Sequence, residues 1–405
     1  MSLPGSTFPH FDTSGGFILQ DLDLRREHAA TGNAGIATVD KARDATARPG
    51  PPSRALHGGP PRKSGGDLVT VVELAEPPRD FLAGELEGYE FYKAFQEAGI
   101  EGFELGYLQA RRHGIAVATA PFFVMRYRIN TTMKGGWLKR LLAPFWLRIA
   151  CIGHPLADFG AIDGEISGPV LEAFNGHLSR KAPIVSYKDF PPTLPLTDFA
   201  VEPGLPVAAL EVRPDYWSRL RQPVRSDFRR RLRKAEALRI EVRDGFPAEL
   251  GDRIYELYLN VHRRGEFSFE TLTRRYFELV GPFSKYALYW EGEALIGFCL
   301  LMCKGNRMHY KYLGMDYERG RPHGLYFIMS LSHVEMCLRD GYTIYQTGCT
   351  TYEFKQRLGS VLHPVYLYYR HRNPLINWVL RKMMAELSVK PEELVAAPAQ
   401  ASEAR

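Results

Sequence analysis

One run of the sequence constrains the fold more than any other, because it reads as a strand, a loop, a helix and a second strand in close succession. Residues 307–313 alternate in character as a strand does, and the segment RGRPHG follows at 319–324. An apolar helix is expected over 325–339, and residues 343–347 read as a strand that ends at Gly348. A helix that crosses from one strand to the next is typical of a layered α/β domain.

The segment 319–324 is predicted to be a loop that binds an anion. A helix N-terminus presents unpaired N–H groups and the positive end of the helix dipole, and glycines let a phosphate approach the backbone. An ordinary strand-to-helix turn is the alternative, because such turns also contain glycine and proline. The residues that we expect to hold a pyrophosphate are Arg319, Gly320, Arg321, His323, Gly324 and Leu325.

A second motif follows Gly348 directly. A turn there carries Tyr352, Glu353 and Lys355, and Gly359 lies four residues beyond the lysine. The Lys355 ammonium suits a phosphate, the Tyr352 phenol can protonate a departing thiolate, and Glu353 can act as a base. The alternatives are a surface lysine, a packed tyrosine and an exposed glutamate.

The composition is that of a globular and mildly basic protein. The 405 residues carry a net charge of +6, which suits an anionic small ligand or membrane surface without requiring nucleic acid. The five cysteines form no CxxC pair, so reduced and mostly buried thiols are expected, and no metal site is predicted. We see neither the pattern of a signal peptide nor an apolar run of about 18 residues, so a cytoplasmic protein is expected.

Composition also divides the chain into four parts. Residues 1–66 are rich in Gly, Pro, Ala, Ser and Arg and are expected to be a disordered tail, and 389–405 a loose one. A first domain is expected over 67–205, with a strand near 68–75 and a hairpin formed by 104–110 and 115–128. A second domain is expected over 206–388, with an Arg-rich helix at 224–238, a meander over 286–313, a final strand at 364–370 and a helix at 374–386.

The second domain resembles the GNAT superfamily of N-acetyltransferases, and within it the branch described as FemAB-like or CelD-like acyltransferases. The superfamily's acyl-CoA-binding pattern is Arg/Gln-x-x-Gly-x-Gly/Ala, which Arg319 and Gly324 fit, with Pro322 where the first glycine belongs. Gly348, Lys355 and Gly359 match the turn that is typical of the branch, whereas Gln346 replaces its aspartate. The resemblance covers 206–380 well and 68–205 loosely.

This resemblance implies two tandem GNAT-like domains, the first one degenerate, each a mixed and largely antiparallel sheet flanked by helices. It implies an N-acyltransferase that moves an acyl group from acyl-CoA, a co-substrate and not a resident cofactor, to an amine of a cell-envelope or lipid precursor. The backbone of strand 307–313 would hold the thioester carbonyl. His309, Lys311 and Gln346 are expected to contact substrate, with His309 or His323 as a candidate base.

Two further segments bear on partners. The helix 224–238 carries Arg225 and Arg229, which belong either to a solvated face or to a site for a phosphate-bearing acceptor or a tRNA; no motif for duplex DNA is present. Residues 137–153 combine tryptophans, basic residues and apolar bulk, so they either touch the inner face of a membrane or pack inside the first domain. An aminoacyl-tRNA-dependent transferase and a non-catalytic module that binds an envelope precursor stay open as other functions.

Overall fold

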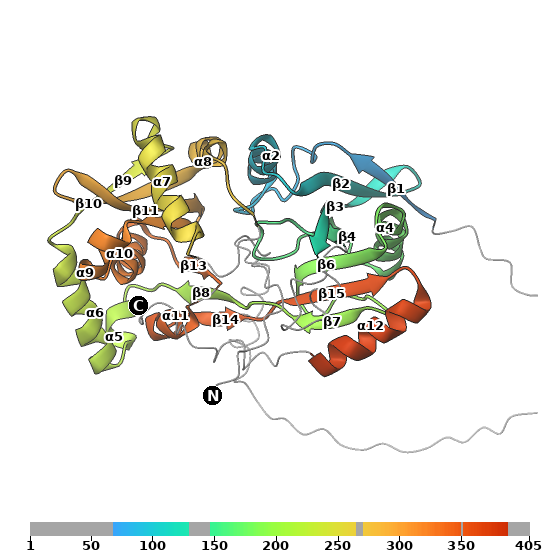
Figure 1. Ribbon diagram of the computed structural model, residues 1–405. Coiled ribbons are helices and arrows are strands. Elements are labelled where there is room, and N and C mark those ends of the chain that lie inside the picture. Colours follow the sequence, from blue (N-terminus) through green and yellow to red (C-terminus); the bar gives the residue numbers. More distant parts are fainter. Residues whose placement is uncertain (1–67, 129–145, 265–269, 350, 388–405) are drawn as a thin grey trace, which may run out of the picture. The chain divides into compact units, whose positions relative to one another are not determined.

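The computed structural model describes residues 68–128, 146–264, 270–349 and 351–387 (Figure 1). From Val69 onward these residues belong to one compact unit, in which two mixed β-sheets carry helices on their faces. The expected fold class, α/β with two sheets flanked by helices, is confirmed. The predicted tails 1–66 and 389–405, and residues 137–145 of the predicted membrane segment, fall outside the described residues.

The first sheet is built mostly from the N-terminal half of the described chain. Its elements are β1 (Val69–Leu74), α2 (Tyr89–Glu97), β2 (Phe103–Arg112), β3 (Ile115–Arg128), β4 (Trp146–Ile152), β5 (Asp163–Gly164), α4 (Gly168–Lys181), β6 (Ile184–Phe190), β7 (Ala200–Pro203), β15 (Tyr366–His371) and α12 (Pro374–Leu387). The strand order is β1-β2-β3-β4-β6-β15-β7, with β5 paired to β3. All neighbours are antiparallel except β4 and β6, and the chain between these two includes α4.

The second sheet has seven strands. Its elements are β8 (Val207–Glu211), α5 (Tyr216–Arg219), α6 (Gln222–Ala235), β9 (Arg239–Asp244), the short helix η2 (Ala248–Leu250), α7 (Gly251–His262), α8 (Arg274–Val280), η3 (Gly281–Phe283), β10 (Ser284–Glu291), β11 (Ala294–Lys304), β12 (Arg307–Met315), α9 (Tyr317–His323), α10 (Leu325–Asp340), β13 (Ile344–Gly348), α11 (Tyr352–Leu358) and β14 (Val361–His363). The order is β14-β8-β13-β12-β11-β10-β9, and only β12 and β13 are parallel.

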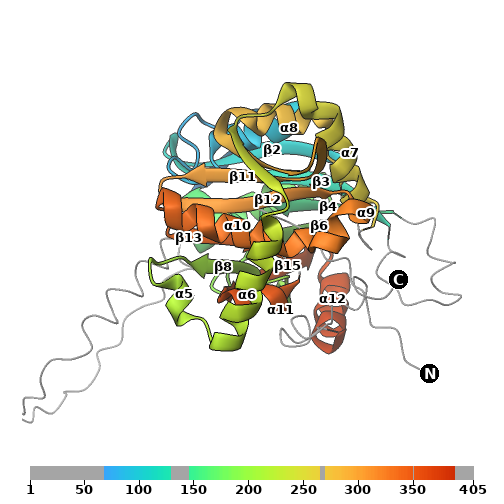
Figure 2. The same cartoon turned by 90° about the vertical axis from the view of Figure 1, so that its left-hand side faces the viewer.

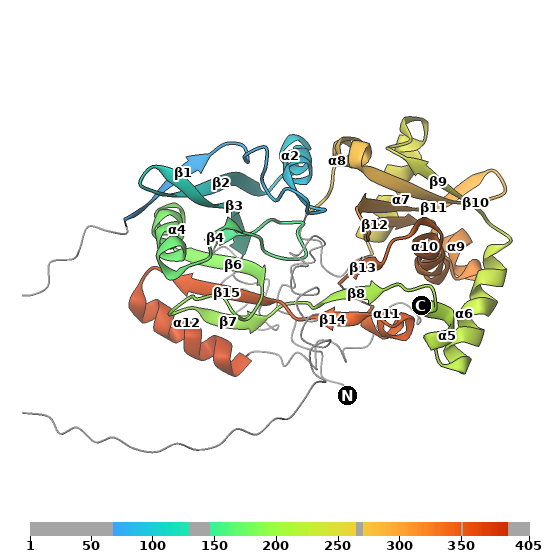
Figure 3. The same cartoon turned by 180° about the vertical axis from the view of Figure 1, so that it is seen from behind.

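The two sheets share one plan. Each has four antiparallel strands, then a parallel neighbour reached through a helix, then two more antiparallel strands. The last two strands are exchanged between the halves: β15, from the C-terminal end, pairs between β6 and β7 in the first sheet, while β8 pairs between β13 and β14 in the second. The segments β7–β8 and β14–β15 therefore run side by side (Figure 3), and Gly204 N–H donates to Val365 C=O at 2.8 Å between them.

Local sequence explains most elements. The hairpin β2–β3 turns at His113 and Gly114, which both have positive φ (52° and 81°), as a two-residue hairpin loop requires. In β11, Phe298, Leu300 and Met302 pack toward α7 and α8, whereas Cys299 and Leu301 pack toward α10. Helices α10 and α6 lie together on that second face (Figure 2). The sheet is thus covered on both sides, which explains why β11 is apolar nearly throughout.

The predicted domain boundary at 205/206 lies between β7 and β8. Strand β15 and helix α12, which the sequence placed in the second domain, pair and pack with the first sheet. Residues 146–152 of the predicted membrane segment form β4, whose last residues are buried in that sheet. No helix in the described part of the chain is long and apolar enough to span a bilayer.

Candidate active site

Strands β12 and β13 part in the middle of the second sheet. They pair at only three positions, from Arg307 with Ile344 to His309 with Gln346, although β12 continues to Met315 and β13 to Gly348. Just past the last pair each strand has a bulge, where Lys311 is left out of the pairing with β11 and Thr347 out of the pairing with β8. Bulges bend and twist a strand, so they help to separate the two strands at this point.

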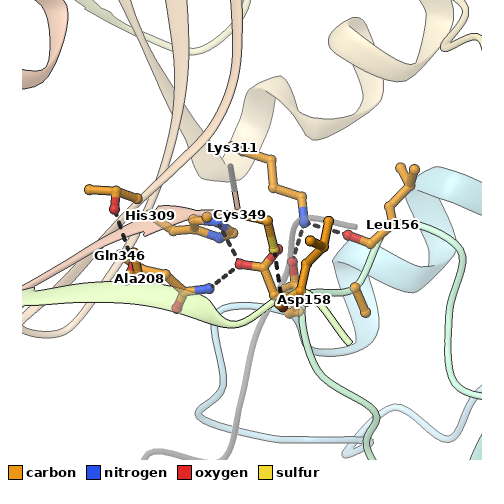
Figure 4. Close-up of polar contacts among 12 residues, drawn as sticks. Leu156, Asp158, Ala208, His309, Lys311, Gln346 and Cys349 are labelled. Carbon is orange, nitrogen blue, oxygen red and sulfur yellow. Dashed lines mark hydrogen bonds and ion pairs between the residues drawn. The ribbon is translucent and has the colours of Figure 1, made fainter. Parts of the chain in front are cut away.

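Asp158, from the segment between β4 and β5, reaches this point from the first half of the chain (Figure 4). Its Oδ2 accepts a hydrogen bond from Nε2 of Gln346 at 2.6 Å and lies 3.5 Å from Nε2 of His309. All three side chains are buried, and Asp158 and His309 are 0% exposed. The structure therefore brings together two predicted substrate-binding residues and adds a carboxylate that the prediction lacked.

Lys311 makes a second polar contact with the first half. Its ammonium contacts Oε1 of Glu87 at 2.5 Å, donates to the carbonyl of Leu156 at 2.8 Å and lies 4.7 Å from the centre of the Phe91 ring. Burial raises the pKa of Glu87 to about 8, although the Lys311 ammonium acts in the opposite direction. These contacts leave the lysine and the glutamate buried against each other beside Asp158.

His309 is a neutral imidazole in this setting. Burial, and then the nearby ammonium groups of Lys311 and Lys355, lower its pKa well below the ordinary value. Neither ring nitrogen has a hydrogen-bond partner within the part of the chain that the structure describes. A neutral imidazole can accept a proton directly, so His309 has the protonation state that a general base requires.

The predicted lysine-bearing turn is the helix α11. It begins after Thr351 and ends at Gly359, whose φ of 96° suits glycine. Lys355 is buried, and its Nζ donates to the carbonyls of Gly348 at 3.0 Å and Cys349 at 2.7 Å. The alternative of a surface lysine is therefore wrong, while a phosphate contact stays a prediction. Tyr352 is also buried, and Glu353 is exposed.

The expectation of a loop at 319–324 is wrong, because these residues belong mostly to the helix α9. Asp316 caps this helix: its Oδ1 accepts from the N–H groups of Glu318 at 3.1 Å and Arg319 at 3.2 Å. Gly324, with φ 70°, ends α9, and α10 begins at Leu325. The predicted ligand site lies at the N-terminus of the next helix, α10, whose N-cap is Gly324 and which has no side-chain cap.

The side chains of this segment also have partners within the protein. Nε2 of His323 lies 2.7 Å from Glu291, and the Arg319 guanidinium lies 3.8 Å from the same carboxylate. Arg321 lies 5.8 Å from the ring centre of Tyr317. Pyrophosphate binding by Arg319, Gly320, Arg321, His323, Gly324 and Leu325 stays a prediction.

The predicted acceptor arginines lie on α6, which packs on α10. Arg225 is half-buried and donates to the carbonyl of Trp217 at 3.3 Å, whereas Arg229 is exposed. Among the described residues, neither forms part of the cluster around Asp158. Three other guanidinium groups converge on the α6 carboxylate of Asp227, at 2.6 Å (Arg230), 3.1 Å (Arg231) and 3.0 Å (Arg357).

Sequence reasoning missed Asp158 and Glu87. Asp158 stands in the apolar run Leu156–Phe159, and a lone acid in such a run must find a partner because an unpaired buried charge is costly. That signal identifies a buried carboxylate without naming its partners. No cluster of His, Cys, Asp and Glu within the described ranges is arranged to hold a metal ion.

Comparison with known proteins assigns a class to the part of the chain that carries His309 and Gln346. Residues 222–356 match the family described as "Acetyltransferase (GNAT) domain". This part of the chain, from the start of α6 into α11, is therefore a GNAT domain, a type of domain associated with acyl transfer. The superfamily that the sequence indicated is confirmed. No curated protein matches the chain.

Solved structures resemble the chain at low identity. A tandem GNAT protein from the clavulanic acid biosynthesis pathway is 13% identical and covers 76% of this chain and 99% of its own, with a TM-score of 0.45. FemX is 13% identical, with coverages of 71% and 90% and a TM-score of 0.42. L-PGS from Bacillus licheniformis is 13% identical, with coverages of 66% and 86% and a TM-score of 0.44.

Proposed function

We propose that this chain is an N-acyltransferase whose reaction takes place where β12 and β13 part. The observation that carries the proposal is the position of His309 and Gln346, because the GNAT match spans both strands and these residues form their last pair. Beyond them the β12 edge no longer pairs with β13, so its backbone N–H groups can hydrogen-bond a thioester carbonyl as negative charge develops on the oxygen.

The reaction that fits this arrangement is aminolysis of a thioester. The acceptor amine forms a bond to the carbonyl carbon, and the carbon–sulfur bond then breaks. His309 takes the proton that the amine loses, since burial holds this imidazole neutral. Tyr352, buried at the start of α11, donates a proton to the departing thiolate and is later reprotonated from solvent.

Asp158 acts as a positioning residue in this scheme. Its carboxylate lies beside Nε2 of His309 and favours the imidazolium that forms when the base accepts a proton. Gln346 holds the same oxygen through a 2.6 Å hydrogen bond. The proposed site therefore needs the first half of the chain, although the donor and acceptor would meet on the second.

We propose acyl-CoA as the donor and an amine of an envelope or lipid precursor as the acceptor. The test uses the full chain with acetyl-CoA and longer acyl-CoAs, a panel of amines, and the release of free thiol as the readout. We expect His309→Gln to lower kcat/KM about a hundredfold or more, with donor affinity little changed, because a general base contributes only in the transition state. Thermal unfolding of each variant checks that it is folded.

Matched variants separate this role from a structural one. His113→Asn changes an exposed histidine at the tip of the β2–β3 hairpin and should leave kcat/KM unchanged. Asp158→Asn should lower activity. Adding Gln346→Glu should restore part of it, because the double variant has the amide at position 158 and the carboxylate at position 346. If no acyl-CoA of any length binds or turns over, the acyl-CoA proposal is overturned.

The aminoacyl-tRNA alternative is favoured by one observation. The expected pyrophosphate loop is helical and capped by Asp316, while Arg229 and other basic residues of α6 are exposed. Binding of tRNA that weakens steeply with salt, and that fails when Arg229 and Arg233 are changed to glutamine, would support this donor in place of acyl-CoA.

A further inference from the structure

Helix α12 is attached to the first sheet by its polar side. Asn377 is buried: its Nδ2 donates to the carbonyl of Asp198 at 2.8 Å, and its Oδ1 accepts from the N–H of His371 at 2.9 Å. One turn later, Arg381 pairs with the Asp198 carboxylate at 2.9 Å. These contacts fix which face of the helix points outward.

The outward face is apolar, which reverses the usual arrangement of a surface helix. Residues 375, 378 and 379 follow the i, i+3, i+4 spacing of one helix face, and 376 lies beside them. The exposed fractions of these side chains are 71% for Leu375, 50% for Ile376, 56% for Trp378 and 41% for Val379. The helix lies along β7 and β15 (Figure 1), and the exposed fractions show that this face is turned to solvent.

Basic groups border the same face. The Lys382 ammonium lies 4.4 Å from the centre of the Trp378 ring, one turn along the helix, and Arg372 is exposed just before the helix begins. The sequence from 374 to 382 contains no acidic residue. Tryptophan, aliphatic side chains and cations together suit the interface of an anionic bilayer, where the ring sits at headgroup depth and cations meet lipid phosphates.

The size of the face favours a membrane over a second protein. Among the side chains of α12 that the structure describes, up to Lys382, four exposed apolar ones lie on two helical turns. These are few beside the roughly 20–30 residues that each partner contributes to a specific protein interface. A bilayer requires no matching shape, so a short apolar strip with flanking cations can act there. We propose that α12 docks the protein on an anionic phospholipid surface, with Leu375, Ile376, Trp378 and Val379 inserted at the headgroup boundary.

The test is sedimentation of the full chain with vesicles. Vesicles of phosphatidylcholine alone are compared with vesicles that also contain phosphatidylglycerol. We expect binding to the anionic vesicles, weaker binding at high salt, and a loss of about tenfold or more in partitioning when Leu375, Trp378 and Val379 are all changed to glutamine. Lys382→Glu should reduce binding to the anionic vesicles selectively.

The control is a pair of equally exposed apolar residues elsewhere, Ile115→Gln and Val361→Gln, which should bind as the wild type does. Sedimentation velocity without lipid tests the other occupant of the face, a second copy of this chain. The proposal is overturned if the wild type is a dimer and the triple variant is a monomer. It is also overturned if the folded wild type does not bind anionic vesicles. Binding is read without turnover, so neither result bears on the proposed acyl transfer.

Discussion

The position of Asp158 changes how the glutamine at position 346 is interpreted. The FemAB-like pattern that the sequence resembles has an aspartate where this chain has Gln346, and that difference kept a non-catalytic function open. The structure places a carboxylate 2.6 Å from the Gln346 amide, on a residue from the other half of the chain. A carboxyl group is therefore present beside His309 in spite of the difference, and a hydrogen bond from the glutamine holds it there.

Glu87 makes stability depend on pH in a direction opposite to most carboxylates. Its pKa is raised to about 8, so the folded protein holds a proton that the unfolded chain releases above its ordinary value of 4.5. This group therefore stabilises the fold most below that ordinary value and loses its effect as pH rises toward 8. Glu87→Gln keeps the uncharged form at every pH.

We expect the free energy of unfolding of the wild type to fall relative to that of Glu87→Gln, on the order of 1–3 kcal/mol between about pH 5 and 8. Urea unfolding of both proteins across that range measures the difference. The same change at Glu90, an exposed residue in the first turn of α2, is the control. Parallel pH curves for wild type and Glu87→Gln would mean that Glu87 is ionised in the folded protein as the partner of Lys311.

At the scale of elements, the helix α9 shows how a local motif can mislead. Gly and Pro between a strand and a helix predicted a loop, and the same letters fit the last turn of a short helix that ends at Gly324. The decisive residue is Asp316, which accepts from the N–H groups of Glu318 and Arg319. An aspartate before Tyr317-Glu318-Arg319 is a recognisable N-cap, so the sequence held this information.

Strand β12 and helix α7 approach each other through Gly314. A Cβ atom at this position would lie 2.6 Å from the backbone carbonyl carbon of Leu257 and 2.6 Å from the backbone nitrogen of Tyr258. Backbone atoms of a packed helix cannot turn away as a side chain can, so Gly314→Ala must push α7 from the sheet. We expect a loss of about 2–3 kcal/mol in the free energy of unfolding, measured by urea denaturation.

Gly176, inside α4, is the matched control for that change. A Cβ atom there would meet nothing within 4 Å, and alanine restricts the unfolded chain more than glycine does. Gly176→Ala should therefore stabilise the protein by about 0.5–1 kcal/mol. If Gly314→Ala and Gly176→Ala have the same free energy of unfolding, the packing of α7 against β12 does not depend on the absence of a Cβ atom at position 314.

At the scale of the whole molecule, contacts within a short stretch were predictable and contacts across the chain were not. The hairpin of β10 and β11 follows from two apolar runs joined by the turn at Glu291-Gly292-Glu293, and the helix α10 follows from its own apolar residues. Asp158 and Gln346 are 188 positions apart, and nothing in the sequence of either segment predicts a contact with the other. The pairing of β15 with β6 could not be predicted either, because the apolar pattern of a strand does not specify which sheet it joins.

The exchange of β8 and β15 makes the two halves depend on each other. Strand β15 pairs with β6 on one side and β7 on the other, and it buries Leu367 and Tyr368 in the first sheet. A chain that stops after His363 keeps every strand of the second sheet but leaves β6 and β7 without the strand between them. Each lost hydrogen bond costs about 0.5–1.5 kcal/mol, and the burial of two large side chains is lost as well.

We therefore expect the chain truncated after His363 to lose protection against amide hydrogen exchange in β6 and β7, while β10 and β11 stay protected. A chain truncated after Leu387 retains β15 and α12 and should keep the wild-type pattern. Since Asp158 precedes β6 in the weakened half, the first truncation should also abolish acyl transfer without touching a residue of the second sheet. Full protection of β6 in that variant would instead mean that the first half folds independently, and that the exchanged strand only links two stable domains.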